Sequence, residues 1–310
     1  MKPAGPAVAL IGPTATGKSA LAHELARRVE GAEIIVLDSM TVYRGMDIAT
    51  AKPREVERHE VRYHLLDVIE PSEEFALAPY QSAARAAAAD IWDRGGSVIY
   101  VGGTGLYGRA VLDDFEIPGR YPEIAADLEA RVTRERESLY ARLVELDPLA
   151  ASRLEASNDR RLVRALEVTL GSGRPFSSFG PGLDSYDEVR VVQIGLAVAL
   201  EVLDARIEER FRRFLDEGLV EEVRALATAP LSRTARQAVG YRELLAHVED
   251  GEELERAVEA AIHQTRRLAR RQLRWFRRDP RIEWFDDPSV ALARATQVLR
   301  DAGSSGKLVS

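Results

Sequence analysis

The sequence predicts an α/β protein: a parallel sheet covered by helices, with a helical domain inserted into it. In the first hundred residues, short apolar runs are separated by helical patterns, which is typical of a parallel sheet. From about Tyr121 to Leu170 the only periodicity is helical. We therefore expect a core made of residues 1–118 and 188–310, and a helical insertion domain at 119–187.

The first apolar run, Val8–Ile11, leads directly into the motif G-x-x-x-x-G-K-S and then into a helical pattern, Ser19–Val29. This is a P-loop in its strand–loop–helix context, so the predicted core is P-loop NTPase-like. Backbone N–H groups and the positive end of the helix favour a phosphate there, and a Ser hydroxyl can ligate Mg²⁺. The residues expected to hold a di- or triphosphate are Gly12, Pro13, Thr14, Ala15, Thr16, Gly17, Lys18 and, also as the metal ligand, Ser19.

The remaining elements follow from periodicity and from Gly or Pro breaks. Further core strands are expected at Ile34–Leu37, Leu65–Ile69, Val98–Val101, Val189–Leu196 and Ile282–Phe285. Core helices are expected at Pro79–Arg94, Leu200–Asp216, Val220–Ala227, Arg233–Leu245 and Glu252–Arg278, with one more closing the fold. The segment Gly171–Pro181 is predicted to be a loop, and Gly303–Ser310 a frayed tail.

Composition limits the possible classes of protein. With 310 residues, 45% hydrophobic and 30% charged, the chain can bury a large core. The absence of cysteine excludes disulfides, thiolate nucleophiles and zinc sites built on Cys, and fits a reducing cytosol. No apolar run is long enough for a membrane span, and no signal peptide is expected, so we expect a cytoplasmic protein. The net charge of −7 argues against nucleic acid as a partner, although a global sum hides local patches.

Two strand ends carry candidate chemistry. Asp38 follows the second strand, where ligands of a parallel sheet bind, and could ligate Mg²⁺ or accept a proton. The fourth strand runs into Gly102-Gly103-Thr104-Gly105 with no acidic residue. An NTPase that activates a γ-phosphate would hold Mg²⁺ with an Asp there, so the sequence disfavours an ATPase or a motor.

One helix near the C-terminus is unusually basic for an acidic chain. Its arginines are Arg266, Arg267, Arg270, Arg271, Arg274, Arg277 and Arg278, whereas Ile262, Ala269, Leu273 and Phe276 form a separate apolar stripe. A solvated helix face normally mixes charge signs, so this face predicts contact with a nucleic-acid backbone. Arg160, Arg161 and Arg164 form a second basic cluster on the insertion.

Taken together, these segments resemble the tRNA dimethylallyltransferase family, enzymes that prenylate adenosine 37 of tRNA. The matching segments are Gly12–Ser19, Asp38–Pro53, Gly102–Tyr107, Asp159–Val168, Arg206–Phe211, Gln237–Glu243 and Thr265–Arg278, which cover nearly the whole chain in order. There are two departures: Thr41 stands where the family usually has Gln, and Ala49 where it usually has Gly.

The resemblance implies that dimethylallyl diphosphate binds in the P-loop with Mg²⁺ and that the N6 amine of the adenine attacks its allylic carbon. It assigns catalytic roles to Asp38, the general base, to Thr104 and to Arg210, with Arg206 as a further cation. It implies tRNA contacts for Asp38, Ser39, Met40, Thr41, Asp159, Arg160, Arg161, Leu162, Val163, Arg164, Gln237, Gly240, Tyr241, Arg266, Arg270 and Arg274. We expect a monomer that binds the anticodon loop and no membrane.

Three alternatives remain open at this stage. A P-loop small-molecule kinase explains the first forty residues equally well, but neither the missing acidic residue nor the arginine helix. A non-catalytic RNA-binding protein would leave Lys18 and Asp38 without a purpose. An adenylate isopentenyltransferase shares the chemistry, and the insertion and the arginine helix favour tRNA over a free nucleotide.

Overall fold

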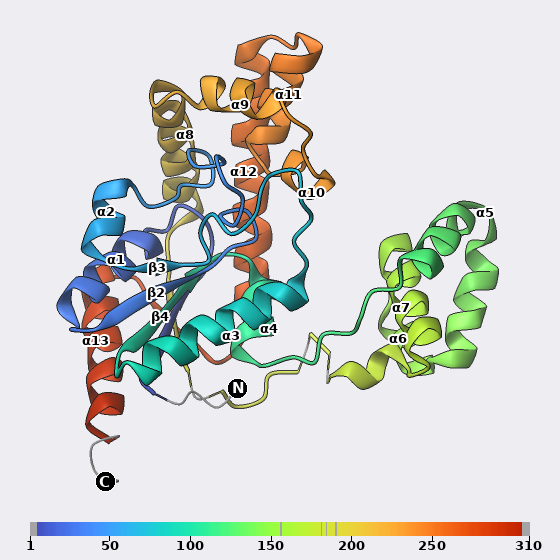
Figure 1. Ribbon diagram of the computed structural model, residues 1–310, viewed down its shortest axis with the longest axis horizontal. Coiled ribbons are helices and arrows are strands. Elements are labelled where there is room, and N and C mark those ends of the chain that lie inside the picture. Colours follow the sequence, from blue (N-terminus) through green and yellow to red (C-terminus); the bar gives the residue numbers. More distant parts are fainter. Residues whose placement is uncertain (1–4, 156, 181, 184, 190, 306–310) are drawn as a thin grey trace. The chain divides into compact units, whose positions relative to one another are not determined.

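The computed structural model describes residues 5–155, 157–180, 182–183, 185–189 and 191–305 (Figure 1). The chain divides into two compact units, of which unit 2 is Asp114–Asp187 and unit 1 is the chain on either side of it. Unit 2 thus begins a few residues before Gly119, where the sequence placed the boundary. These extra residues are held within unit 2, because Arg164 donates to the carbonyl of Pro118 at 2.9 Å and Arg174 pairs with Glu116 at 3.0 Å.

The core of unit 1 is a six-stranded, fully parallel sheet in the order β3-β2-β4-β1-β5-β6. Its strands are β1 (Ala7–Ile11), β2 (Ala32–Leu37), β3 (Tyr63–His64), β4 (Ser97–Gly102), β5 (Val192–Leu196) and β6 (Ile282–Phe285). The predicted strand Leu65–Ile69 is wrong, because Leu65 and Asp67 adopt left-handed backbone angles, with φ of 64° and 55°. Only Ile69 forms an isolated bridge, to Tyr43. The strand predicted from Val189 begins at Val192, and Arg190 lies outside the described residues.

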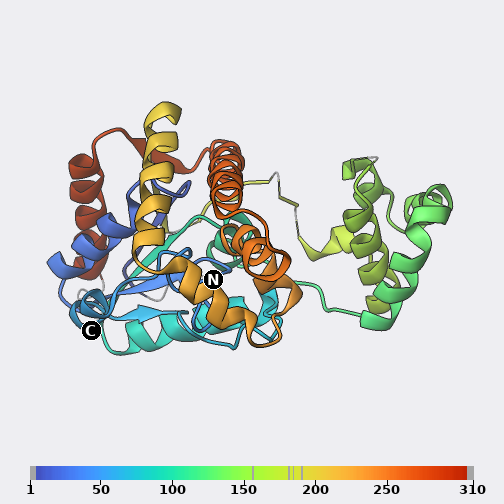
Figure 2. The same ribbon diagram turned by 90° about the horizontal axis from the view of Figure 1, so that it is seen from above.

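Helices cover both faces of the sheet (Figures 1 and 2). α1 (Lys18–Arg28) and α13 (Pro288–Ser305) pack against one face, where Val8 and Leu10 of β1 are buried. α3 (Leu77–Asp93) packs against the opposite face and against α4 (Gly105–Leu112), and the alternate residues Ala9 and Ile11 are buried there. β1 is thus apolar along its whole length because both of its faces are covered.

A group of helices follows β5: α8 (Leu200–Asp216), α9 (Leu219–Ala227), α10 (Arg233–Arg236), α11 (Tyr241–Asp250) and α12 (Leu254–Phe276). α12 packs against α8 and α11 (Figure 1). The predicted single helix Arg233–Leu245 is wrong, since the chain leaves the helix at Gln237 and restarts after Gly240, whose φ is +94°. The sequence also missed α4 and the short helix α2 (Glu55–Glu60).

Unit 2 is entirely helical and has its own core, which contains Leu128, Leu143 and Leu166. Its elements are α5 (Pro122–Leu146), α6 (Pro148–Arg153), α7 (Asp159–Ser172) and the 3₁₀ turn η1 (Phe176–Phe179). The predicted loop Gly171–Pro181 is therefore partly helical, and Pro181 lies outside the described residues.

The C-terminal helix α13 extends further than the sequence predicted. α13 continues to Ser305, so the frayed tail predicted from Gly303 is wrong over its first residues, and 306–310 fall outside the described part.

In the part of the chain that the structure describes, no helix combines the length and the apolar character that crossing a membrane requires.

Candidate phosphate-binding and catalytic site

The register of the sheet brings three strand ends to one edge. Ile11 of β1 and Leu37 of β2 are both paired with Gly102 of β4. Because all three strands are parallel, the segments that follow them leave the sheet side by side. The P-loop, Asp38 and the Gly102–Gly105 loop therefore meet at the carboxyl edge, as the sequence predicted from their places after strands.

The P-loop folds back on itself between β1 and α1. Gly12 and Gly17 adopt positive φ angles of 141° and 98°, which glycine tolerates because it lacks Cβ. The buried Thr16 hydroxyl donates to the carbonyl of Pro13 at 3.1 Å, and Lys18 Nζ donates to the same oxygen at 2.9 Å. Ser19 lies exposed in the first turn of α1. The loop thus presents an ammonium group, a hydroxyl and the N-terminus of a helix in one place.

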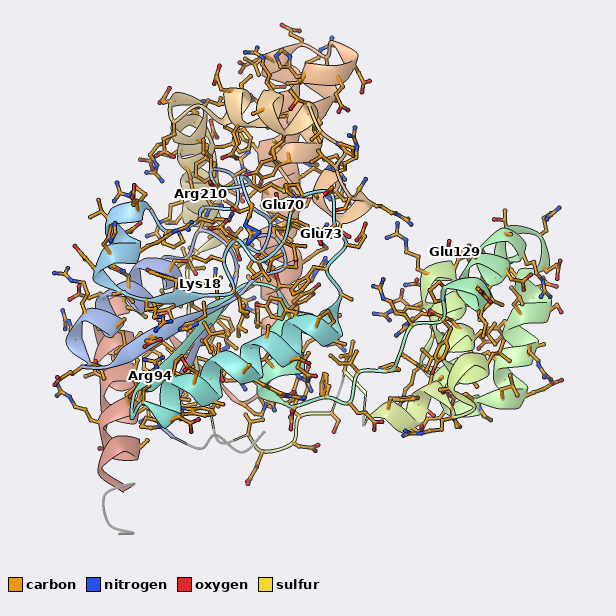
Figure 3. The ribbon with its side chains drawn as sticks, in the orientation of Figure 1. Lys18, Glu70, Glu73, Arg94, Glu129 and Arg210 are labelled. Atoms are coloured by element: carbon orange, nitrogen blue, oxygen red, sulfur yellow. The ribbon has the colours of Figure 1, made fainter. Side chains whose placement is uncertain are left out.

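Two helices from the C-terminal half hold the P-loop at Thr14. Arg210 of α8 donates to the Thr14 hydroxyl at 2.9 Å. The carbonyl of Gln272 on α12 accepts the Thr14 backbone N–H, also at 2.9 Å. Figure 3 labels Lys18 at the start of α1 and Arg210 on α8. Arg210, predicted from the resemblance, therefore reaches the phosphate loop, whereas the sequence analysis did not single out Gln272.

The two cations of the site, Lys18 and Arg210, are desolvated, and the charge of Arg210 acts on Lys18. Burial and, to a smaller extent, the charge of Arg210 lower the pKa of Lys18 to about 8, against the opposing effect of Asp38. Burial also lowers the pKa of Arg210 to about 10, with Arg213 acting in the same direction. Both shifts mean that the charged forms are penalised in the absence of an anion. A bound di- or triphosphate would remove this penalty.

Asp38 is partly buried at the end of β2, and its Oδ1 accepts the backbone N–H of Met40 at 2.8 Å. Burial raises the pKa of Asp38 above its ordinary value, although Met40, Lys18 and the side chain of Thr104 act in the opposite direction. A carboxylate with a raised pKa is a better proton acceptor than an ordinary surface Asp. Thr104 is brought to Asp38 by the glycine turn: a Cβ on Gly102 would lie 2.0 Å from the carbonyl oxygen of Leu37.

The segment after Asp38 is held by charged contacts, centred on the buried Lys52 and on Glu222, that no motif in the sequence indicates. Lys52 Nζ lies 2.6 Å from carboxylate oxygens of both Asp47 and Asp67. Glu222 accepts the backbone N–H groups of Asp47 and Ile48, each at 3.1 Å, and the hydroxyl of Tyr241 at 2.6 Å. Glu222 gave no local signal, because its partners Asp47 and Ile48 lie 175 and 174 residues away in the sequence.

Several residues that the resemblance assigns to tRNA contacts are buried in this structure. Tyr241 is 2% exposed and Thr41 is 4% exposed, and Gly240 packs against Ala49. Their side chains pack within the protein, and a contact of these residues with tRNA stays a prediction. Gln237, in contrast, is exposed, and Ser39 and Met40 are partly exposed.

The arginine face of α12 divides in two. Arg266 pairs with Glu208 at 2.7 Å and Arg270 with Asp204 at 2.6 Å, both on α8. These two cations link helices, so only part of their charge is offered to a ligand. Arg267, Arg271, Arg274 and Arg277 are exposed, and no carboxylate in the described part of the chain pairs with them. We call these four residues the exposed arginine stripe.

The basic cluster of unit 2 is similarly divided. Arg160 and Arg161 are exposed at the start of α7. Arg164 instead pairs with Glu167 at 2.9 Å and Asp159 with Arg136 at 2.6 Å. Two more predicted tRNA contacts lie in the core of this unit, since Leu162 is 1% exposed and Val163 is 6% exposed. These two apolar side chains hold α7 in the core of unit 2, and their contact with tRNA stays a prediction.

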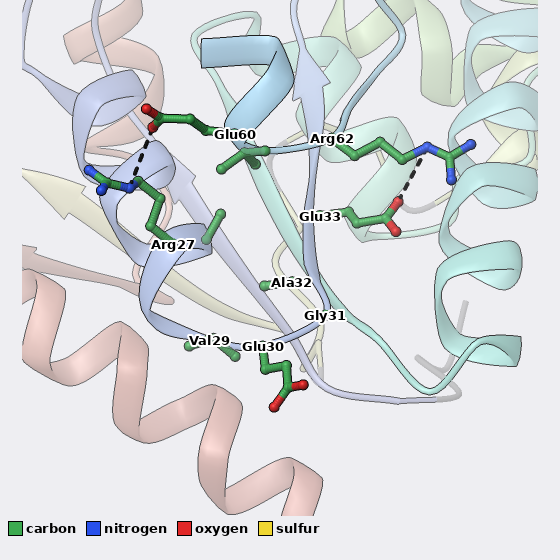
Figure 4. A pocket seen from close by; sticks show the side chains of 10 residues that line it. Arg27, Val29, Glu30, Gly31, Ala32, Glu33, Glu60 and Arg62 are labelled. Atoms are coloured by element: carbon green, nitrogen blue, oxygen red, sulfur yellow. Dashed lines mark ion pairs between the residues drawn. The ribbon is translucent and has the colours of Figure 1, made fainter. Parts of the chain in front are cut away.

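A pocket also lies at the opposite end of β2, away from the P-loop (Figure 4). Both arginines that line it pair with carboxylates, Arg27 with Glu60 at 3.4 Å and Arg62 with Glu33 at 3.9 Å, whereas Glu30 is exposed. Because the strand ends that carry the site residues are at the other edge of the sheet, we assign no role in the site to this pocket.

The residues at the P-loop fit a magnesium ion only together with a phosphate ligand. The described residues contain no cluster of three or more His, Cys, Asp or Glu suited to a metal. The exposed Ser19 hydroxyl offers one oxygen. Mg²⁺ commonly takes such a ligand, substrate phosphate oxygens and several waters, so this sparse set is compatible with it.

Fold and site together define a P-loop-type α/β protein with an anion site and a candidate base at the carboxyl edge of its sheet. Residues 41–279 match the family described as IPP transferase, and residues 6–71 match that described as isopentenyl transferase. The first match covers most of the chain, so the chain belongs to the IPP transferase family, the tRNA dimethylallyltransferases.

Individual relatives agree with this assignment. A tRNA dimethylallyltransferase of Geobacter metallireducens is 47% identical over 89% of this chain and 91% of its own. One from Kineococcus radiotolerans is 45% identical over 93% and 92%. The crystal structure of a tRNA isopentenylpyrophosphate transferase from Bacillus halodurans superposes with a TM-score of 0.70, at 34% identity over 98% of both chains. That of a eukaryotic dimethylallyltransferase acting on tRNA gives 0.70 at 26% identity, over 87% of this chain and 70% of that one.

Proposed function

We propose that the protein transfers the dimethylallyl group of dimethylallyl diphosphate to N6 of adenosine 37 in the anticodon loop of tRNA, releasing pyrophosphate. The observation that carries this is the meeting of Lys18, Arg210 and Asp38 at one edge of the sheet. The names of the relatives, tRNA dimethylallyltransferases, support the choice of substrates.

In this reaction the diphosphate lies in the P-loop, on Gly12–Ser19, with Lys18 and Arg210 near its oxygens. The N6 nitrogen forms a bond to the allylic C1 while the C1–O bond breaks, and both electrons of that bond leave with pyrophosphate. The proton lost by N6 passes to Asp38. The two cations then stabilise the charge that grows on the leaving group, which is where such groups contribute most to the rate.

Mg²⁺, held by Ser19 and the diphosphate, would add further charge neutralisation to the leaving group. Nothing in the reaction attacks phosphorus. This fits a β4 strand that ends in Gly102 with glycine and Thr104 after it, where a phosphotransferase would carry an Asp.

The exposed arginine stripe of α12 and the exposed Arg160 and Arg161 supply the contacts to the tRNA backbone. Asp38 lies at strand ends in a partly buried position, so an adenine stacked in the anticodon loop must be extruded to reach it. Extrusion costs a few kcal/mol and is cheapest in an unpaired loop, and backbone contacts offset that cost. We further propose that the enzyme acts as a cytoplasmic monomer.

One assay tests the function. The protein is incubated with radiolabelled dimethylallyl diphosphate, Mg²⁺ and either tRNA, AMP or ATP, and the labelled product is identified. Label in adenosine 37 of tRNA is the expected result. Label in AMP or ATP would instead make the protein an adenylate isopentenyltransferase, and tRNA-stimulated hydrolysis of ATP without prenyl transfer would make it an NTPase.

A further inference from the structure

Gln272 uses both ends of its side-chain amide to join two loops of the site. Its carbonyl oxygen accepts the backbone N–H of Thr14, in the P-loop, at 2.9 Å. Its amide nitrogen donates to the backbone carbonyl of Gly103, in the loop after β4, also at 2.9 Å. The contact is close, since a Cβ on Gly103 would lie 2.8 Å from this nitrogen.

We propose that Gln272 is a positioning residue that sets the spacing between the P-loop and the Gly102–Gly105 loop, and thereby the geometry in which a diphosphate is bound. Strand pairing fixes these two segments only as far as Ile11 and Gly102. Beyond that register, Gln272 joins the P-loop, which holds the anion, to the Gly102–Gly105 loop, which carries Thr104 near Asp38. We call this pair of hydrogen bonds the glutamine clamp.

The glutamine clamp requires the amide side chain of Gln272, because it needs one donor and one acceptor. Thr14 N–H needs an acceptor and the Gly103 carbonyl needs a donor, and a glutamine side chain of fixed orientation supplies one of each. A carboxylate offers only acceptors and an ammonium only donors, so either would leave one backbone group facing a group of its own kind. A methionine of similar size supplies neither function.

The position of Gln272 on α12 adds a second consequence. Its neighbours Arg271 and Arg274 belong to the exposed arginine stripe, so one helical turn carries both the stripe and the clamp on the P-loop. If tRNA binds the exposed arginine stripe, as the proposed function requires, α12 fixes the position of the tRNA relative to the diphosphate in the P-loop. The inference rests on the proposed function only for the identity of the anion as a diphosphate.

Binding of inorganic pyrophosphate in the presence of Mg²⁺ tests the clamp without any reaction, by isothermal titration calorimetry. Gln272→Met should weaken binding about tenfold, because two backbone groups lose their partners. Gln264→Met is the matched control, since Gln264 lies on the same helix and makes none of the hydrogen bonds found at Gln272. The control should bind as the wild type does. Equal affinity of Gln272→Met and the wild type would overturn the proposal.

The Gln272→Glu variant distinguishes the clamp from a merely structural role, because only the clamp predicts that pyrophosphate affinity depends on the protonation of the new side chain. At about pH 8 the new carboxylate repels the Gly103 carbonyl, and pyrophosphate binding should be weak. The facing Gly103 carbonyl disfavours the ionised form and raises the pKa of this carboxyl above its ordinary value of about 4.3, so it becomes partly protonated as the pH falls to about 5.5, and its O–H and C=O then reproduce the amide pattern. The affinity of the variant relative to the wild type should therefore recover with falling pH. A ratio that stays constant between these pH values would contradict the clamp.

Kinetics with both substrates separate the clamp from the proposed function. In Gln272→Met the KM for dimethylallyl diphosphate should rise about tenfold, while the KM for tRNA stays within about twofold. If wild-type protein binds pyrophosphate but transfers no prenyl group, the proposed function fails and the clamp is still tested by calorimetry. If transfer is normal and Gln272→Met leaves both pyrophosphate affinity and this KM unchanged, the clamp fails alone.

Discussion

Arg210 lies close enough to Lys18 for its charge, added to the effect of burial, to bring the pKa of the lysine down to about 8. The guanidinium is itself fixed by a hydrogen bond to the Thr14 hydroxyl. Lys18 is therefore partly deprotonated near neutral to mildly alkaline pH, when no anion is present. The phosphate loop thus holds a titratable cation whose charge depends on the ligand.

Pyrophosphate binding should take up protons. An anion beside Lys18 favours its charged form and raises its pKa above about 8, so at about pH 8.5 binding draws a proton from solution. Affinity should fall as the pH rises through 8, where the free protein loses this proton. Calorimetry in buffers of different ionisation enthalpy measures the uptake. Lys18→Met should bind more weakly and abolish the uptake, and wild-type binding with no exchange of protons at this pH would contradict the assignment.

Asp38→Asn should lower kcat for prenyl transfer by about 10²–10⁴-fold, which is the usual contribution of a general base. The amide preserves the acceptor for the backbone N–H of Met40, so the local turn should remain intact. Affinity for tRNA, measured by filter binding, should stay within a few-fold of the wild type. Loss of tRNA affinity equal to the loss of rate would show that Asp38 binds rather than reacts.

The rate of the wild-type enzyme should fall on acidification at a higher pH than an ordinary carboxyl would require. Burial raises the pKa of Asp38, and the protonated form cannot accept the N6 proton, so activity is present above this pKa and is lost below it. A profile of kcat/KM for tRNA against pH measures the effect. Activity that stays level until the protein unfolds would argue against Asp38 as the base.

The exposed arginine stripe should bind the backbone of tRNA, and the paired arginines should contribute less. Replacing Arg271 and Arg274 together by Ala should weaken tRNA binding and reduce the slope of log affinity against log salt by about one for each lost contact. The double variant of Arg224 and Arg256, which are exposed elsewhere on unit 1, is the control for lost charge. If both double variants behave alike at every salt concentration, the stripe is an ordinary solvated face.

Tyr241→Phe should destabilise the protein by about 1–2 kcal/mol, because Glu222 loses a hydrogen-bond donor in a largely buried place. Chemical denaturation measures the change in the free energy of unfolding. Tyr241 is buried, so tRNA affinity should change little in the folded variant. Weakened tRNA binding without any loss of stability would show that the tyrosine touches RNA after all.

The sequence predicted the parts of the site that are marked by a short motif or by a place directly after a strand. The P-loop is read from Gly12, Gly17 and Lys18, and Asp38 from its place after a strand. Gln272 had no such signature, because its partner Thr14 lies 258 residues away in the sequence. The sequence also could not separate Arg270 from Arg271, since the difference is the carboxylate of Asp204 on a neighbouring helix.

The fold was predictable for similar reasons and to a similar extent. Unbroken apolar runs such as β1 and β4 were located to within a residue or two, because strands that are buried on both faces are apolar at every position. The strand predicted at Leu65–Ile69 failed because backbone angles at Leu65 and Asp67, set by contacts such as Lys52 to Asp67, overrode its apolar composition.

The attachment of Thr14 to both Arg210 and Gln272 also orders events during synthesis of the chain. The ribosome makes the phosphate loop among the first twenty residues, yet both of its anchors follow unit 2: Arg210 comes with α8, and Gln272 only with α12 near the end of the chain. A nascent chain that ends before α12 can form β1 and its neighbour β4 but lacks the glutamine that fixes the loop. The phosphate loop with both anchors in place therefore exists only after α12 has been made.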